Sequence, residues 1–115
     1  MAYDADLAER IREIVAVERG LSEQRMFGGL AFLVGGHMAV AASGQGGLMV
    51  RVPADQTDAL LRRAHVTPMT MAGREIRGWL LVDPEGVRTT RQLQSWVRRG
   101  VDYVKGLPVK GLPPK

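Results

Sequence analysis

Few residues in this 115-residue sequence have the types and spacing that chemistry requires. The chain has no cysteine, which excludes disulfides, thiolate nucleophiles and cysteine-bound zinc. His37 and His65, the only histidines, are far apart in sequence and lack a nearby carboxylate pattern, so they predict no metal site. Ser22, Ser43 and Ser95 have neither a nucleophile-elbow motif nor an obvious base. We therefore expect no enzymatic activity, no cofactor and no bound metal.

A glycine cluster at residues 44–47, Gly-Gln-Gly-Gly, has the composition of a loop that cradles phosphate. Such a loop normally lies between a strand and a helix N-terminus, with a following Lys-Ser/Thr pair or a dinucleotide fold around it. Here strand-like apolar runs flank the cluster on both sides. The pattern therefore favours a hairpin loop.

Basic residues on and just before the last predicted helix form a candidate nucleic-acid site. A basic stripe is what phosphate binding requires. However, Asp102 follows Arg98 by four residues and Arg99 by three, so pairing along the helix would neutralise part of the stripe. No aromatic stacking platform or recognition-helix pattern accompanies it. A solvated helix face is favoured, and nucleic-acid binding remains the alternative, carried by Arg88, Arg91, Arg98, Arg99 and Lys105.

Short apolar runs separated by glycines predict the elements that position these residues. Runs of about five apolar residues bounded by turn signals are typical of strands, and periodic apolar stripes at 3/4 spacing are typical of helices. Gly100 lies inside the last helical stripe, where we expect it to permit close approach to a neighbouring element. The predicted order is α-β-β-β-α-β-β-α, with helices over about 4–18, 55–64 and 90–105 and strands over 30–34, 38–42, 48–52, 66–71 and 75–82.

This order predicts an α+β fold, a two-layer domain with helices packed on an antiparallel sheet. Alternation along the strands places one set of side chains against the helices: Leu30, Phe32, Met38, Val40, Leu48, Val50, Ile76 and Leu80. The opposite face would carry Leu33, Ala39, Ala41, Met49, Trp79 and Leu81. That face is too apolar for contact with water across a whole sheet. Either the second helix or the tail covers it, or it binds a partner.

The partner interpretation makes the apolar face an interface with another protein or with a second copy of the chain. Trp79 would anchor it, because tryptophan buries a large area and often dominates interfaces. Arg51 and Arg77, predicted on the same face, would form a polar rim. The predicted partner surface comprises Leu33, Met49, Arg51, Arg77, Trp79 and Leu81.

Length and composition are those of one globular domain. With 45% hydrophobic and 24% charged residues, the chain can bury a core without a disulfide or metal. We expect one domain over residues 1–106 and a flexible tail rich in Pro, Gly and Lys over 107–115. The acidic N-terminal segment lacks an apolar run, and no stretch is long enough to span a bilayer, so we expect a cytoplasmic protein.

Several motifs resemble a known family. The element Met26, Phe27, Gly28, Gly29, preceded by Arg25 and followed by a glycine-turned hairpin, is similar to the N-terminal domain of the TfoX/Sxy competence regulators. So are Leu-Met-Val-Arg-Val at 48–52 and the pattern from 96 to 108, in matching order. The resemblance implies a two-layer domain of the secretion-chaperone-like kind, in a stand-alone copy. It also implies a non-enzymatic regulatory or protein-interaction role, with no catalytic residues to carry over. We expect a structural role for Gly28 and Gly29 themselves, at a bend or bulge where a side chain would be in the way.

Overall fold

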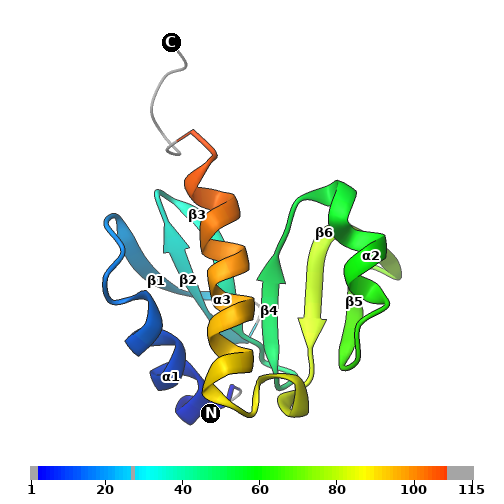
Figure 1. Ribbon diagram of the computed structural model, residues 1–115, viewed down its shortest axis with the longest axis horizontal. Coiled ribbons are helices and arrows are strands. Elements are labelled where there is room, and N and C mark those ends of the chain that lie inside the picture. Colours follow the sequence, from blue (N-terminus) through cyan, green and yellow to red (C-terminus); the bar gives the residue numbers. More distant parts are fainter. Residues whose placement is uncertain (1–2, 27, 109–115) are drawn as a thin grey trace.

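The computed structural model describes residues 3–26 and 28–108, and its centre is a six-stranded antiparallel sheet (Figure 1). The strands lie in the order β1-β2-β3-β4-β6-β5. Three helices and two short 3-10 turns complete the domain, which confirms the predicted α+β class. The strands are β1 (Leu21–Met26), β2 (Gly29–Val34), β3 (His37–Ala42), β4 (Leu48–Arg51), β5 (Val66–Met71) and β6 (Arg74–Val82); the helices are α1 (Ala5–Val15), α2 (Thr57–Leu61) and α3 (Thr90–Lys105), and the 3-10 turns are η1 (Ala54–Gln56) and η2 (Pro84–Val87).

The strands predicted over 30–34, 38–42 and 48–52 are present as β2, β3 and β4, and a strand that was not predicted, β1, precedes them. β1 pairs with β2 from Leu21–Val34 to Met26–Gly29 and forms one edge of the sheet. Its central residues are polar and exposed, so it has no apolar alternation to reveal it. A polar edge strand is also one that resists pairing with other chains. The first helix correspondingly ends at Val15 rather than Glu18, which leaves room for a turn and β1.

The two long helices form where periodicity and caps predict them. Asp4 caps α1, accepting hydrogen bonds from the backbone N–H groups of Asp6 and Leu7 at 2.9 and 3.2 Å. α3 has the predicted bounds, and its N-cap is Thr89, in a capping box with Gln92. The buried stripe of α3 is Leu93, Trp96, Val97, Gly100, Val101 and Val104.

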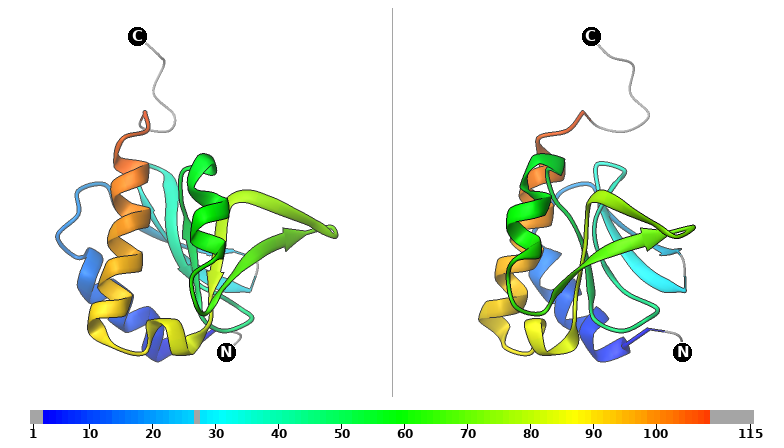
Figure 2. Two further views of the ribbon diagram at one scale, coloured as in Figure 1. Left: turned by 45° about the vertical axis from the view of Figure 1, so that its right-hand side comes forward. Right: turned by 90° about the vertical axis from the view of Figure 1, so that its right-hand side faces the viewer.

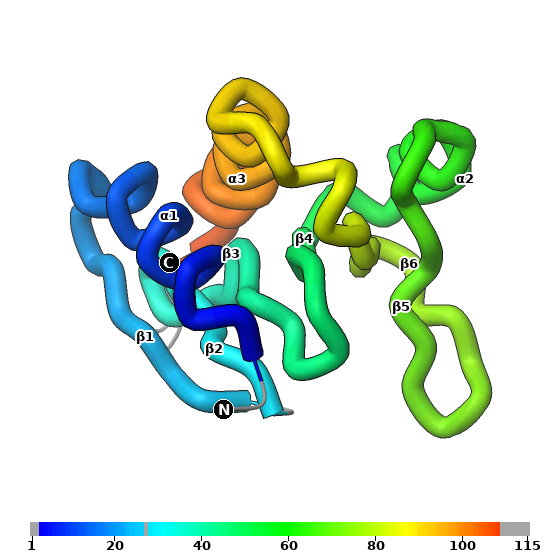
Figure 3. Tube along the Cα trace, turned by 90° about the horizontal axis from the view of Figure 1, so that it is seen from below, coloured from blue at the N-terminus to red at the C-terminus, as the bar shows by residue number. Residues whose placement is uncertain are grey.

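All three helices lie on one side of the sheet. The main core joins buried residues of α1, α2 and α3 to one face of the strands. Viewed from below, α1, α3 and α2 lie on one side, and the β1–β2 and β5–β6 ends of the sheet project to the other (Figure 3). Figure 2 shows the same projection of the β5–β6 hairpin. The second helix therefore does not cover the outer face of the sheet.

A β-bulge in β3 reverses two predicted orientations. The β2–β3 register runs from Phe32–Val40 to Leu33–Met38, which leaves Ala39 without a partner. Ala39 consequently belongs to the main core, and Met38 packs on the outer face. Unbroken alternation along the strand predicts the opposite placement of both residues, and the bulge makes that prediction wrong.

An irregularity in β6 reverses two more predicted side-chain orientations. Gly78 has φ of +88°, and the β5–β6 register shifts between Pro68 and Thr70. Strict alternation fails there, so Ile76 shares the outer face with Trp79 instead of joining the helix-facing core. Arg77 turns to the opposite side, where its guanidinium meets Asp58 and the Ala54 carbonyl.

The segment after α3 begins by packing on the domain. Leu107 packs against the main core, and the Pro108 carbonyl oxygen lies 2.6 Å from Nε2 of His37. The predicted tail over 107–115 therefore starts with two residues in contact with the domain, and its residues 109–115 lie outside the described residues.

Candidate functional site: a methionine-lined sheet face

The outer face of the sheet carries an apolar cluster that no helix covers. Its buried members are Ala31, Ala41, Met49 and Met69, and its half-buried members include Met26, Met38 and Trp79. We call this surface the methionine face, because it holds five of the six methionines of the chain: Met26, Met38, Met49, Met69 and Met71. Methionine is unbranched and polarisable, so a surface built from it can adapt to differently shaped partners.

The methionine face is hollowed. Residues of β1, β2 and β3 line it together with residues of the β5–β6 hairpin. The hollow has a volume of about 430 Å³, which is in the usual range for binding sites. Met71, on the hairpin, is 44% exposed, whereas Met69 beside it is 9% exposed. The lining residues are Gln24, Met26, Leu33, Gly36, His37, Met38, Arg51, Met69, Met71, Ile76 and Trp79.

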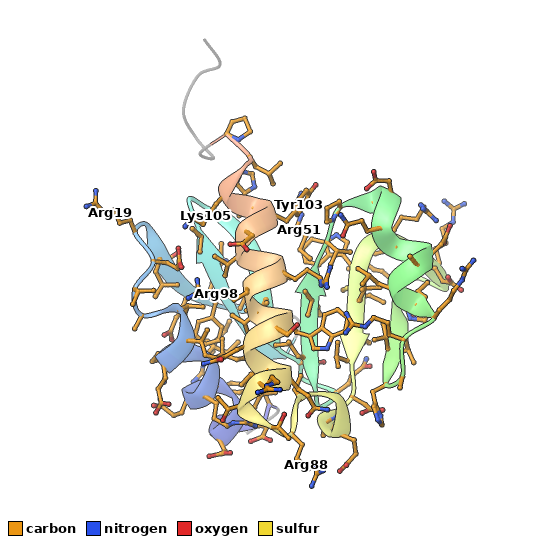
Figure 4. The ribbon with its side chains drawn as sticks, viewed as in Figure 1. Arg19, Arg51, Arg88, Arg98, Tyr103 and Lys105 are labelled. Atoms are coloured by element: carbon orange, nitrogen blue, oxygen red, sulfur yellow. The ribbon has the colours of Figure 1, made fainter. Side chains whose placement is uncertain are left out.

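Arg51 is the cation of this hollow. It is directly opposite Trp79 in the β4–β6 ladder, and its guanidinium lies 5.4 Å from the Trp79 ring centroid. The same guanidinium lies 5.6 Å from the ring of Tyr103 on α3 (Figure 4). Cation–π attraction thus holds the half-buried Arg51 between two aromatic rings.

The structure brings together five of the six predicted partner-surface residues. Leu33, Met49, Trp79 and Leu81 belong to one cluster, and Arg51 lies beside Trp79. Arg77 does not join them, because its Nη1 atom pairs with Asp58 at 3.0 Å on the helix side. Sequence reasoning missed Met26, Met38, Met71 and Ile76, whose positions depend on β1, the bulge and the β6 irregularity. Methionine, the residue type of three of these four positions, was the available signal.

The Met-Phe-Gly-Gly element runs from the last residue of β1 to the first residue of β2. Met26 ends β1, Phe27 lies outside the described residues, and Gly28 has φ of +78°. At Gly29 a β-carbon would overlap the carbonyl oxygen of Ala42. Both glycines therefore satisfy backbone requirements, one of conformation and one of space.

The basic residues of the nucleic-acid alternative do not form one free patch. The Glu18 carboxylate, only 7% exposed, lies 3.1 Å from the Lys105 ammonium and 3.6 Å from the Arg98 guanidinium. Arg98 therefore pairs with Glu18, and within the described ranges no ion pair joins it to Asp102. Figure 4 shows Arg88 at the far end of α3 from Lys105.

The remaining members of that set lie apart. Arg88 pairs with Glu85 at 3.6 Å, and Arg91 is exposed beside a shallow hollow between α1 and α3. Arg99 lies with its guanidinium 5.6 Å from the Trp96 ring, which Arg63 approaches to 4.8 Å. Three of these residues are thus in ion pairs, Arg99 lies beside an aromatic ring, and Arg91 is exposed to solvent.

The polar residues considered for catalysis are also separated. His37 contacts the Pro108 carbonyl, whereas Nδ1 of His65 lies 3.1 Å from Asp83. The Ser43 hydroxyl accepts a hydrogen bond from the Gln45 backbone at 3.1 Å. Residues 43–47 connect β3 to β4, so the glycine cluster is the predicted hairpin loop.

Among the helices of the described residues, none combines the length and apolar character that crossing a membrane requires.

Comparison with known proteins identifies a family. A family model described as TfoX N-terminal domain matches residues 13–104, from within α1 to the end of α3. No curated protein and no solved structure matches the chain. The matched region contains every strand of the sheet and every described residue of the methionine face. Because the match covers most of the sequence, this chain belongs to the TfoX N-terminal domain family.

Proposed function

We propose that the protein is a non-enzymatic regulatory module of the cytoplasm that binds a protein partner through the methionine face. The observation that carries this proposal is the gathering of five methionines and Trp79 around an open hollow on the side of the sheet without helices. Apolar surface of this kind is characteristic of interaction sites. Membership of the TfoX N-terminal domain family supports a competence-regulator-like role.

The two edges of the sheet favour binding through its face. β1, at one edge, exposes Ser22, Glu23, Gln24 and Arg25. β5, at the other, contains Pro68, which has no N–H to donate. Polar residues and proline are the devices that keep edge strands from pairing with other chains. The apolar face is therefore the better surface for association, with another protein or with a second copy of this chain.

Capture of partners from the native host tests the proposal. Wild type and Trp79→Asp are used as baits, with Val17→Asp as a matched control, because Val17 is an apolar residue 74% exposed after α1 and away from the hollow. We expect wild type and Val17→Asp to capture the same protein and Trp79→Asp to lose it. Sedimentation of all three proteins reports whether the captured protein is a second copy.

The proposal fails if folded Trp79→Asp captures the same proteins as wild type. Thermal melting of each variant separates loss of the surface from loss of the fold. Trp79 is only half-buried, so an aspartate there can reach water without disrupting the main core.

A further inference from the structure

Arg51 lacks a counterion inside the hollow that it lines. Within the described parts of the chain, its guanidinium has no ion pair and no hydrogen bond, only the rings of Trp79 and Tyr103. None of the other residues lining the hollow is acidic. The adjoining hollow beside Met49, lined by Ser43, Gln45, Met49, Met69, Thr70, Met71 and Leu81, has no acidic residue either.

The acidic residues of the neighbouring strands, Glu23 and Glu75, do not line the hollow. Glu23 on β1 bonds to Arg12 of α1, on the helix side of the sheet. Glu75 on β6 is exposed and is not among the residues that line the hollow. The residues that line the hollow thus combine a large apolar area with one permanent positive charge, that of Arg51, which no acidic lining residue neutralises.

From this charge pattern we infer that the partner segment is an acidic amphipathic helix. The inference rests on the proposed function, because it names the chemistry of the partner that the methionine face receives. Apolar side chains on one side of the helix would pack on the methionines, as helices do in adaptable grooves. A glutamate or aspartate beside them would pair with Arg51, whose stacking between two rings fixes the guanidinium before binding.

Two other occupants of the hollow, the C-terminal residues of the chain and a second copy of it, complement the charge of Arg51 less well. Residues 109–115 follow Pro108, which touches His37 at the rim of the hollow, but they contribute Lys110 and Lys115 and no acidic side chain. A second copy would bring its own Arg51 to the same surface in a symmetric dimer. An acidic segment of another protein supplies the negative charge opposite Arg51 that both of these occupants lack.

A display library of 16-residue amphipathic helices provides the probe. The apolar positions are fixed as leucine, and the polar positions are randomised among Glu, Lys, Gln and Ser. The library is selected on wild type, Arg51→Gln and Trp79→Asp, with Arg91→Gln as control, because Arg91 is exposed on α3 away from the hollow. We expect wild type and Arg91→Gln to enrich glutamate over lysine, and Arg51→Gln to lose that preference.

Affinity of one selected acidic peptide completes the test. It should bind Arg51→Gln at least about tenfold more weakly than wild type. Exchanging its glutamates for lysines should weaken binding to wild type by a similar factor, and this arm remains decisive if Arg51→Gln fails to fold. Methionine-methyl spectra should locate the peptide at Met38, Met69 and Met71.

Three outcomes overturn the inference. If peptides bind in a Trp79-dependent way but show no acidic preference, the inference of an acidic partner is wrong. The proposed function, binding of a protein through the methionine face, would still hold. Methionine-methyl shifts on removing residues 109–115, or on raising the protein concentration without peptide, would assign the hollow to the tail or to a second copy. Absence of any Trp79-dependent peptide would exclude helix docking, and the capture experiment would then decide the proposed function independently.

Discussion

Gly100 on α3 and Ala39 on β3 pack backbone against backbone: a β-carbon at Gly100 would lie 2.5 Å from the Ala39 carbonyl oxygen. It would also lie 3.1 Å from a methyl group of Val40. The bulge at Ala39 lies at this contact, directly under the longest helix. The predicted close approach at Gly100 is therefore present, and the bulged residue is the one it approaches.

Gly100→Ala should consequently destabilise the protein by about 1–3 kcal/mol, because the helix must move away from β3. Helix propensity alone would give the opposite sign, a gain of about 1 kcal/mol. Gln94→Ala is the control, since Gln94 is exposed on the same helix, and it should change the free energy of unfolding by less than about 0.5 kcal/mol. Urea denaturation measures both. A more stable Gly100→Ala protein would show that α3 does not pack as described.

Gly29→Ala tests the structural role of the Met-Phe-Gly-Gly element. Overlap with the Ala42 carbonyl should cost about 3 kcal/mol. Gly46→Ala is matched to it: Gly46 has φ of +92°, but a β-carbon there meets nothing within 4 Å, so only about 1 kcal/mol of backbone strain is expected. Thermal and urea unfolding give the comparison. A Gly29→Ala protein that unfolds like wild type yet captures no partner would make the element a recognition site instead.

The Arg12–Glu23 pair gives an acid-dependent contribution to stability. Arg12 donates two hydrogen bonds to Glu23, at 2.6 and 2.8 Å, and these bonds lower the pKa of the Glu23 carboxyl. Because the folded pKa is below the unfolded one, the contribution is complete above the unfolded pKa and disappears as pH falls through the folded pKa. The pair is partly exposed, so the effect is small.

Arg12→Gln should raise the Glu23 pKa toward its ordinary value, as measured by carbon NMR of the side-chain carboxyl during an acid titration. Arg10→Gln is the control on the same helix, because Arg10 contacts the carbonyls of Val87 and Arg88 instead. An unchanged Glu23 pKa in Arg12→Gln would mean that the bidentate pair does not form in solution.

Nucleic-acid binding is tested by its dependence on salt. Because Glu18 pairs with Arg98 and Lys105, we expect no detectable binding of duplex or single-stranded DNA or RNA at low salt, measured by fluorescence anisotropy. If binding occurs and weakens steeply with salt, and neutralising Arg91, Arg98 and Arg99 flattens that slope, the basic helix face is the functional surface.

Local patterns predicted the helices and most strands because their signals are periodic. α3 has the predicted bounds, and β5 has the bounds of the strand predicted over 66–71. β1 was missed because Ser22, Glu23 and Gln24 show no apolar alternation, and its pairing with β2 is a tertiary property. The tertiary sheet, rather than local propensity, makes this segment a strand.

The site was predicted only where the strands keep regular alternation. Leu33, Met49, Trp79 and Leu81 are on the predicted face. Met38, Ala39, Ile76 and Arg77 are not, because one bulge and one glycine irregularity reverse the alternation, and neither has a local sequence signal strong enough to place it. The hollow itself depends on how the β5–β6 hairpin projects from the sheet. This is a tertiary arrangement that the sequence of a single strand does not predict.

The most direct test of the methionine face as a binding surface uses its own methyl groups. The protein is labelled with carbon-13 at the methionine methyls and nitrogen-15 at the backbone, and spectra are recorded with and without the protein captured from the native host. We predict that the methyl signals of Met38, Met69 and Met71 shift or broaden, while the backbone signals of the exposed α3 residues Arg91 and Gln94 stay in place. Unchanged methionine methyls together with shifted α3 backbone signals would contradict this account and assign binding to the basic helix face.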